Sequence, residues 1–163
     1  MGYEDVRLYL FNNKLYFTGI SKQLTDKIGV SFGEYELLNN MIFATEYSQT
    51  FKNTACEKNW SLLEYENKLC VIYSYNPLII CTFNDQKREL EILKINTNMP
   101  MLFKHARGSS NGVLYENEYY FIVHFVSYTQ PRNYYHLLCV FDINMNLLRY
   151  SNIFKFSNSA IEY

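Results

Sequence analysis

The chain has 163 residues, a formal net charge of −1, 48% hydrophobic residues and 19% charged residues. This composition is typical of a globular protein with a substantial core and excludes a disordered chain. The balanced charge argues against a dedicated nucleic-acid binder, and the long uncharged run at 69–83 is too short, and too broken by Pro77, to span a membrane. We therefore expect neither nucleic acid nor membrane as a partner.

The first predicted element is a β-hairpin over residues 9–17, in which two apolar runs flank Asn12 and Asn13. Asparagine tolerates left-handed backbone angles and suits a tight hairpin turn. The segment 31–40 is the one place where we expect a short turn of helix. A strand is predicted over 41–45, because this run is apolar and rich in strand-forming residues.

The same hairpin returns twice further along the chain, at 63–71 and 113–121, with Asn67 and Asn117 in the turns. The three turn asparagines are 54 and then 50 residues apart. A period near 50 residues that contains hairpins is typical of β-propeller blades. The remaining apolar runs fit this repeat, since they predict further strands at 78–83, 89–95, 136–142 and 146–156.

The predicted fold class is therefore all-β, built from β-propeller repeats, with about three blades of a larger ring. The blades would cover roughly residues 1–55, 56–104 and 105–163 of a single partial domain. A two-sheet sandwich made from the same hairpins is the alternative, but a sandwich does not predict a hairpin that repeats every 50 residues.

Three polar clusters stand immediately before the three hairpins, at the same place in each repeat. They contain the following candidate residues: Glu4, Asp5 and Arg7 in the first, Lys58, Asn59 and Trp60 in the second, and Arg107 in the third. Equivalent positions of propeller blades converge near the central axis, so we expect these clusters to meet at the mouth of a channel. Their ordinary alternatives are a charged chain terminus, a tryptophan that anchors one blade to the next, and a flexible turn.

Each cluster has side chains suited to sugar or anion chemistry. A carboxyl such as Asp5 can serve as an acid at a glycosidic bond. A tryptophan face stacks on sugar rings, and lysine, asparagine and arginine donate hydrogen bonds to hydroxyl or phosphate oxygens. A fourth group surrounds His124 and includes Tyr135, although a lone histidine within a strand is more often a core residue.

The four cysteines have no metal-ligand spacing, and three of them lie in apolar runs. We expect buried, reduced thiols, no metal and no cofactor, with inorganic phosphate as the one possible co-substrate. The start of the chain is acidic and does not read as a secretion signal, which together with the thiols favours a cytoplasmic location.

Several of these motifs are familiar in combination. Residues 4–8 (Glu-Asp-Val-Arg-Leu) resemble the Glu-Asp-Pro-Arg motif of the five-bladed β-propeller glycosidases and mannoside phosphorylases, glycoside hydrolase family 130 and its relatives. Four later segments resemble further motifs of that superfamily, in the same order: residues 57–60, residues 107–110, the strand around His124, and residues 161–163 with Glu162. Val6 departs from the family's proline.

The resemblance implies a five-bladed ring and a carbohydrate-active function, the cleavage of glycosidic bonds in mannoside-type sugars. Asp5 would match the proton donor, and the other candidates would bind phosphate or sugar hydroxyls: Glu4, Arg7, Lys58, Asn59, Trp60, Arg107, His124, Tyr135 and Glu162. The alternative is a non-catalytic glycan-binding or glycosyltransferase-associated interaction module, or an inactive copy. Three blades also leave sheet faces exposed, so we expect self-association or a chain that supplies further blades.

Overall fold

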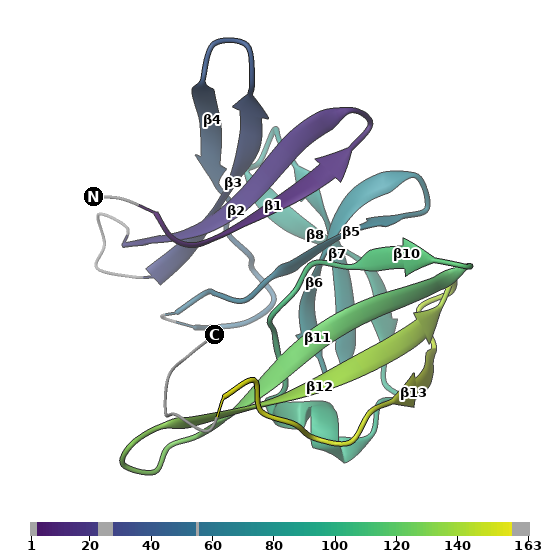
Figure 1. Cartoon of the computed structure of the whole chain (residues 1–163). Helices are drawn as coiled ribbons and strands as arrows, with labels where there is room; N and C mark the ends of the chain where they lie inside the picture. The colour runs from purple at the N-terminus through teal and green to yellow at the C-terminus, as the bar shows by residue number, and fades with distance from the viewer. Residues whose placement is uncertain (1–2, 23–27, 55, 158–163) are drawn as a thin grey trace.

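The computed structural model describes residues 3–22, 28–54 and 56–157, and these form three separate antiparallel sheets (Figure 1). The first sheet contains β1 (Glu4–Phe11), β2 (Lys14–Lys22), β3 (Ile28–Glu36) and β4 (Met41–Glu46). The second contains β5 (Ser61–Tyr65), β6 (Lys68–Tyr75), β7 (Leu78–Asn84) and β8 (Glu89–Asn96). In both sheets the strands lie side by side in chain order.

The third sheet has the same meandering order with a broken first strand. Its strands are β9 (Arg107–Gly108), β10 (Val113–Tyr115), β11 (Glu118–Ser127), β12 (Asn133–Asp142) and β13 (Leu147–Tyr150), and both β9 and β10 pair with β11. A short 3-10 helix, η1 (Met101–His105), precedes this sheet. The sequence did not predict this helix.

The repeated hairpin turn is confirmed at all three places. Two-residue loops join β1 to β2, β5 to β6 and β10 to β11, and every residue in them has a positive φ between 48° and 63°: Asn12, Asn13, Glu66, Asn67, Glu116 and Asn117. Two successive positive φ values define the turn that matches the natural twist of a hairpin. This is why asparagine returns at the second position of each turn.

The expected helical turn at 31–40 is wrong, because residues 28–36 form β3 and residues 37–40 form the turn into β4. The alternation of Val30, Phe32 and their neighbours is a strand pattern, and β3 pairs with β2 along its whole length. The sandwich alternative is also wrong for the described residues, since three sheets rather than two carry the strands.

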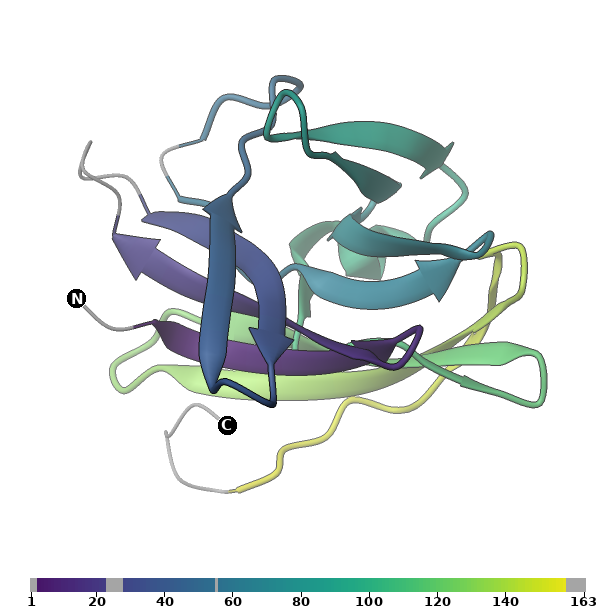
Figure 2. The ribbon, with the colours of Figure 1, turned by 90° about the horizontal axis from the view of Figure 1, so that it is seen from above.

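Two hydrophobic clusters join the sheets face to face. One lies between the first and second sheets and is built from Val30, Phe32, Trp60, Leu62 and Val71, among others. The other lies between the second and third sheets, around Ile72, Phe121 and Leu137. In Figure 2 the colours show that each sheet is formed by one continuous stretch of chain. Packing of successive blades in this way buries one face of each sheet on the next.

The first strands of the three sheets also meet one another through hydrogen bonds. The side-chain amide of Asn111 donates to the carbonyl of Leu8 over 2.9 Å, and its oxygen accepts from the backbone N–H of Leu62 over 2.9 Å. The N–H of Gly112 donates to the Leu62 carbonyl over 2.7 Å. A Cβ on Gly112 would lie 2.7 Å from the Phe121 ring, so this close approach requires glycine.

Cys70, Cys81 and Cys139 are buried and Cys56 is exposed, and all four are free thiols. Burial raises the pKa of Cys70 to about 11 and those of Cys81 and Cys139 to about 12. They are therefore protonated, unreactive core residues, as expected. Among the described residues no helix is long and apolar enough to cross a membrane.

Candidate functional site

Arg7 joins the three polar clusters that precede the three hairpins. Its guanidinium donates hydrogen bonds to the carbonyl of Trp60 over 3.2 Å, to the side-chain oxygen of Asn59 over 3.3 Å and to the carbonyl of Gly108 over 2.9 Å. We call this set of four residues the Arg7 junction. Residues from all three blades thus meet at one point, although the first and the last of them, Arg7 and Gly108, lie 101 positions apart in the chain.

The Arg7 junction is closely packed, and its guanidinium is partly buried. Burial lowers the pKa of Arg7 from its ordinary value, while the nearby Tyr75 and Asp5 act in the opposite direction. A Cβ on Gly108 would lie 2.2 Å from the hydroxyl of Ser61 and 2.6 Å from the carbonyl of Asn59. Glycine at position 108 therefore lets the third blade come close enough for its carbonyl to accept from Arg7.

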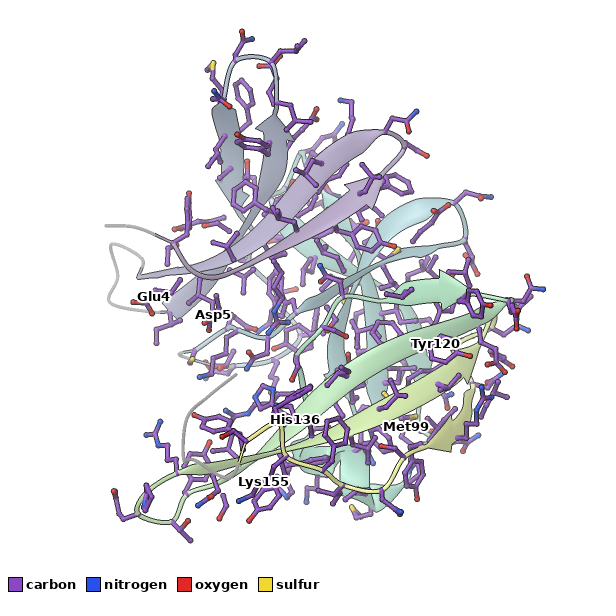
Figure 3. All side chains as sticks on the ribbon, in the orientation of Figure 1. Glu4, Asp5, Met99, Tyr120, His136 and Lys155 are labelled. Atoms are coloured by element: carbon purple, nitrogen blue, oxygen red, sulfur yellow. The ribbon has the colours of Figure 1, made fainter. Side chains whose placement is uncertain are left out.

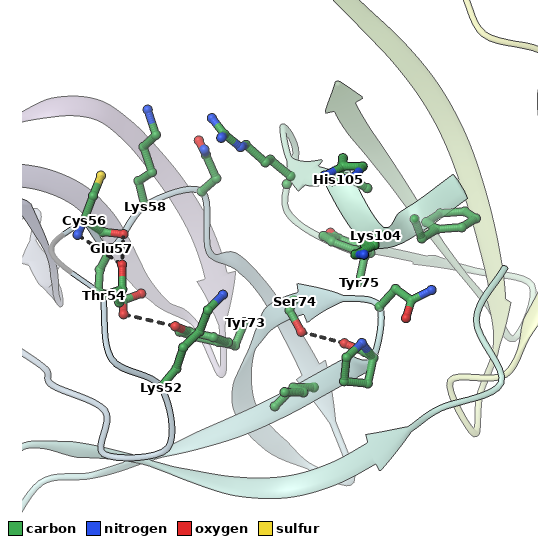
Figure 4. A pocket seen from close by; sticks show the side chains of 18 of the residues that line it. Lys52, Thr54, Cys56, Glu57, Lys58, Tyr73, Ser74, Tyr75, Lys104 and His105 are labelled. Atoms are coloured by element: carbon green, nitrogen blue, oxygen red, sulfur yellow. Dashed lines mark hydrogen bonds between the residues drawn. The ribbon is translucent and has the colours of Figure 1, made fainter. Parts of the chain in front are cut away.

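A cavity of about 500 Å³ opens beside this junction, and Asn59 and Gly108 form part of its wall. One side comes from the segment between β4 and β5, and the other from η1 and the segment that leads into β9. Figure 4 shows Lys52 and Lys58 on the first side, Lys104 and His105 on the second, and the end of β6 with Tyr73 between them. This volume is in the range of small-molecule sites.

The cavity is strongly cationic, although the chain as a whole has a net charge of −1. Lys52, Lys58, Lys104 and Arg107 line it, and Glu57 is the one carboxylate among the described lining residues. Lys52 lies over the Tyr73 ring, 5.7 Å from its centroid, and Arg107 donates to the Tyr128 hydroxyl over 2.8 Å. We call this hollow the cationic cavity. Its charge suits an anionic group.

Glu57 is held by three hydrogen bonds to its carboxylate. One oxygen accepts from the amide of Gln49 over 2.9 Å and from the hydroxyl of Tyr73 over 3.0 Å, and the other accepts from the indole N–H of Trp60 over 3.3 Å. Burial and the neighbouring Glu57 charge raise the pKa of Tyr73, so its hydroxyl stays protonated and donates. Glu57 therefore orders this side of the cavity.

The proposed sugar-stacking role of Trp60 is wrong. Its side chain is 2% exposed and packs in the cluster between the first and second sheets, with its ring 6.2 Å from that of Tyr73. A ligand in the cavity cannot reach the face of this ring. Trp60 instead anchors one blade to the next, which was the alternative reading of this residue.

The first cluster lies at the start of β1, next to the cavity. Asp5, Arg7, Asn59 and Trp60 line a much smaller hollow that shares Asn59 with the cationic cavity. Asp5 and Glu4 are exposed, and Figure 3 labels both where the first sheet begins. Asp5 has a φ of 50° and sits in a bulge of the β1–β2 ladder. The two carboxylates therefore lie beside the cavity and not within its wall.

His124 and Tyr135 lie outside the cavity. His124 is 6% exposed, pairs with Arg107 across the β9–β11 ladder, and has its Nδ1 2.7 Å from the hydroxyl of Ser109. Tyr135 faces Phe125 across the β11–β12 ladder, and Lys155 lies over its ring at 4.6 Å. These two positions thus support the third sheet. Glu162 lies outside the described residues, as do the rest of positions 161–163.

The buried His124 gives a testable pH dependence. Burial, and then the positive charge of Arg107, lower the pKa of His124 to about 4, against about 6.5 in an unfolded chain. Between these values the unfolded chain binds a proton that the folded chain excludes, so the free energy of unfolding should fall as the pH drops from 6.5 to 4. The loss due to this group should be about 3 kcal/mol at most.

Urea unfolding at pH 7.0, 5.5 and 4.5 measures this loss. A His124→Gln variant should be less stable at pH 7 but should lose less stability over the same interval. If the variant and the natural chain show equal losses, His124 is not the group that titrates.

Sequence reasoning missed Lys52, Lys104 and Tyr73 as lining residues. Lys52 and Lys104 are separated by 52 residues, close to the repeat period, and both precede the first strand of a blade. The repeat spacing could therefore have found them. Tyr73 gave no such signal, since it lies within an apolar strand. Within the described residues no group of three His, Cys, Asp or Glu side chains could hold a metal ion.

Comparison with known proteins gives one structural likeness. A thermostable family-43 glycoside hydrolase of known crystal structure matches the chain with a TM-score of 0.57 and 11% sequence identity. The match covers 90% of this chain and 53% of that enzyme, so the chain spans about half its length. No model of a known protein family matches the chain, and no curated protein matches it.

At this identity the likeness shows the fold alone. The chain is an all-β protein built from β-propeller repeats, about three blades of a larger ring, as the repeated hairpin predicted. The count of five blades for that ring came from the family resemblance. The likeness is to family 43, so the closer resemblance to family 130 stays a prediction. The expected blade limits at 55 and 104 also stay predictions.

Proposed function

We propose that the chain binds a carbohydrate that carries a negatively charged group, with the cationic cavity as its site. The observation that carries this proposal is the cluster of Lys52, Lys58, Lys104 and Arg107 around one cavity, whose single described carboxylate already accepts three hydrogen bonds. Hydrogen bonds between cationic donors and phosphate, sulfate or carboxylate oxygens are among the strongest that a protein makes. A site of this charge favours an anionic ligand over a neutral one.

The rest of the cavity wall suits a sugar ring. Phe51 and Tyr73 contact each other edge to face, 4.9 Å between centroids, and both line the cavity together with amide and hydroxyl groups of Asn59, Ser74 and Asn76. A sugar has an apolar ring face and a rim of hydroxyl groups, and an aromatic side chain next to hydrogen-bonding groups matches both. The propeller fold is shared with an enzyme named as a glycoside hydrolase, which supports carbohydrate as the ligand class.

Binding is favoured over cleavage by the state of the carboxylates. Glycosidic cleavage ordinarily uses two carboxyl groups on either side of the bond. Glu57 is the carboxylate in the cavity wall, and three hydrogen bonds from protein groups hold it in place. An acid or base would therefore have to come from outside this wall.

Calorimetric titration of the chain tests the binding proposal. The ligands are three charged sugars, mannose 6-phosphate, glucuronate and galactose 6-sulfate, together with mannose and inorganic phosphate, all at low salt. We expect mannose 6-phosphate to bind about 10-fold or more tightly than either fragment, because it fills both the cationic and the aromatic parts of the cavity. Absence of binding by mannose 6-phosphate, glucuronate and galactose 6-sulfate alike would rule the proposal out.

A second candidate function is the cleavage of mannoside-type glycosides, with Asp5 as the proton donor. The observation in its favour is the strained backbone of Asp5 beside the Arg7 junction, since non-glycine residues with positive φ concentrate at functional sites. Attack by inorganic phosphate would give a phosphorylase, and attack by water a hydrolase. The cationic cavity would then hold the attacking phosphate.

Release of product from 4-nitrophenyl β-mannoside, with and without inorganic phosphate, tests this second function. The Asp5→Asn change should abolish any turnover while leaving mannose 6-phosphate binding in place. Turnover that is equal in the variant would exclude Asp5 as the acid. If the natural chain binds sugar phosphate but releases no product, the cleavage function is excluded and only the binding function stands.

A further inference from the structure

The charged residues of the third sheet are sorted between its two ends. From residue 92 to residue 161 the only carboxylates in the sequence are those of Glu116, Glu118 and Asp142. Glu118 pairs with Asp142 at one end of the β11–β12 ladder, and Glu116 lies in the adjoining β10–β11 turn. Figure 1 shows this end on the right, and the β11–β12 turn at the opposite end, at the lower left. The carboxylates of the third sheet therefore gather at the end away from the β11–β12 turn.

The other end of the sheet has two arginines held around one tyrosine. Arg107, in the wall of the cationic cavity, donates to the Tyr128 hydroxyl over 2.8 Å. Arg132 lies over the ring of the same tyrosine, with its guanidinium carbon 5.7 Å from the ring centroid. Tyr128 is 65% exposed, and Arg132 is exposed as well. Positive charge therefore continues from the cavity wall, across Tyr128, to the β11–β12 turn.

Lys155 adds a further positive charge at the base of this turn. Its ammonium group donates to the side-chain oxygen of Asn133 over 2.9 Å. The amide of Asn133 donates in turn to the carbonyl of Pro131 over 3.1 Å, so hydrogen bonds within the turn hold its shape. We call Tyr128, Arg132 and Lys155 the basic extension of the cationic cavity.

The basic extension holds like charges near one another. Within the described part of the chain, neither Arg107 nor Arg132 forms an ion pair with a carboxylate. Like charges repel, and an anionic group that accepts hydrogen bonds from such a cluster relieves the repulsion. The exposed Tyr128 between the two arginines has an aromatic body and a hydroxyl tip, which suits contact with a sugar ring. The extension thus offers the same two kinds of contact as the cavity.

We propose that the ligand is a chain of acidic sugars, with one charged unit in the cationic cavity and a following charged unit on the basic extension. This inference rests on the proposed function, because the cavity takes the first unit. A single tyrosine side chain separates Arg107 from Arg132, a gap that linked sugar units can span. A nucleic acid also presents spaced charges, but the net charge of −1 disfavours it.

Calorimetric titration with mannuronate and with its β-1,4-linked tetramer, at about 0.1 M salt, tests the proposal. We expect the tetramer to bind about 30-fold more tightly than the monomer, which is the gain from one added charge-assisted hydrogen bond. A gain of about 4-fold or less is the statistical advantage of four equivalent units. It would overturn the extension and leave the cavity site standing. Absence of binding by mannuronate, the tetramer and mannose 6-phosphate alike would instead overturn the proposed function, and this inference with it.

Substitutions locate the second unit. Arg132→Gln removes a charge outside the cavity wall and should reduce the ratio of tetramer to monomer affinity to about the statistical 4-fold. Arg149→Gln is the matched control, because Arg149 is an exposed arginine of the same sheet that pairs with Glu118 at the acidic end. Its ratio should equal that of the natural chain. An unchanged ratio in Arg132→Gln would contradict the proposal.

A thymidine oligonucleotide with four phosphates separates the two classes of polyanion. It has the same number of charged units as the mannuronate tetramer but no acidic sugars. We expect it to bind at least about 10-fold more weakly than the tetramer at the same salt concentration, because binding to phosphates alone is mostly electrostatic and is screened by salt. Equal or tighter binding of the oligonucleotide would make nucleic acid the ligand class and overturn the proposal.

Discussion

Replacement of Arg7 by methionine should lower the free energy of unfolding by about 2 to 4 kcal/mol. The guanidinium makes three hydrogen bonds to residues of the second and third blades, two of them to backbone carbonyls. Methionine fills a similar volume but leaves these acceptors without a donor in a partly buried setting, and an unsatisfied buried carbonyl is costly. The midpoint of urea unfolding, followed by circular dichroism, measures the loss.

Two further variants show that the effect comes from the junction. Arg149→Met removes an arginine that donates two hydrogen bonds to the Glu118 carboxylate. This ion pair lies at the surface and should contribute little to the free energy of unfolding. Arg7→Lys keeps the charge but can donate to only some of the three acceptors. Its unfolding midpoint should therefore lie between those of Arg7→Met and the natural chain. Equal midpoints for Arg7→Met and the natural chain would mean that the three blades do not depend on this contact.

The double change Lys58→Ala with Arg107→Ala should weaken binding of mannose 6-phosphate at least about 100-fold, because each lost charge-assisted bond contributes roughly 1.5 to 3 kcal/mol. The two cations belong to different walls of the cationic cavity, Lys58 to the segment before β5 and Arg107 to β9. Lys58 is exposed and Arg107 is half-buried, so both can reach an anionic group in the cavity. Calorimetric titration of the variant against the natural chain measures the change.

A matched control uses a cation outside the cavity. Lys87 lies at the β7–β8 turn, where its side chain is 65% exposed and pairs with Glu91 at 3.8 Å. Lys87→Ala removes a positive charge and should leave the affinity within about 2-fold, because Lys87 does not line the cavity and an exposed charge acts only weakly through solvent. Comparable losses in Lys87→Ala and the double variant would indicate general electrostatic attraction and not a defined site.

Much of the fold could be predicted from the sequence because the hairpin carries its own local signal. Asn13, Asn67 and Asn117 mark turns that need positive φ, and their spacing revealed the blades before any contact was known. The prediction of helix at 31–40 failed because the apolar alternation of Val30 and Phe32 stops at Glu34, so the second half of β3 has no strand pattern in the sequence. The helix η1 went unseen, since its five residues are too short to produce a helical period.

The site was predictable only in part. The rule that equivalent positions of blades converge correctly brought Arg7, Asn59 and Gly108 together. It could not tell which side chains point into the cavity and which pack between sheets, because that depends on the rotation of each sheet about its neighbour. Trp60 was therefore misplaced, and the contribution of Lys104 from η1 was missed.

The central claim is that an anionic sugar binds in the cationic cavity beside the Arg7 junction. Titration of the isotopically labelled chain with mannose 6-phosphate, followed by amide chemical shifts in NMR spectra, tests it most directly. We expect the largest shifts on the two walls of the cavity, at residues 52–59 and 104–108, with small shifts in β13 and in the β3–β4 turn. Saturable shifts confined to other surfaces, or no shifts at millimolar ligand, which is the weak end of specific binding, would contradict the claim.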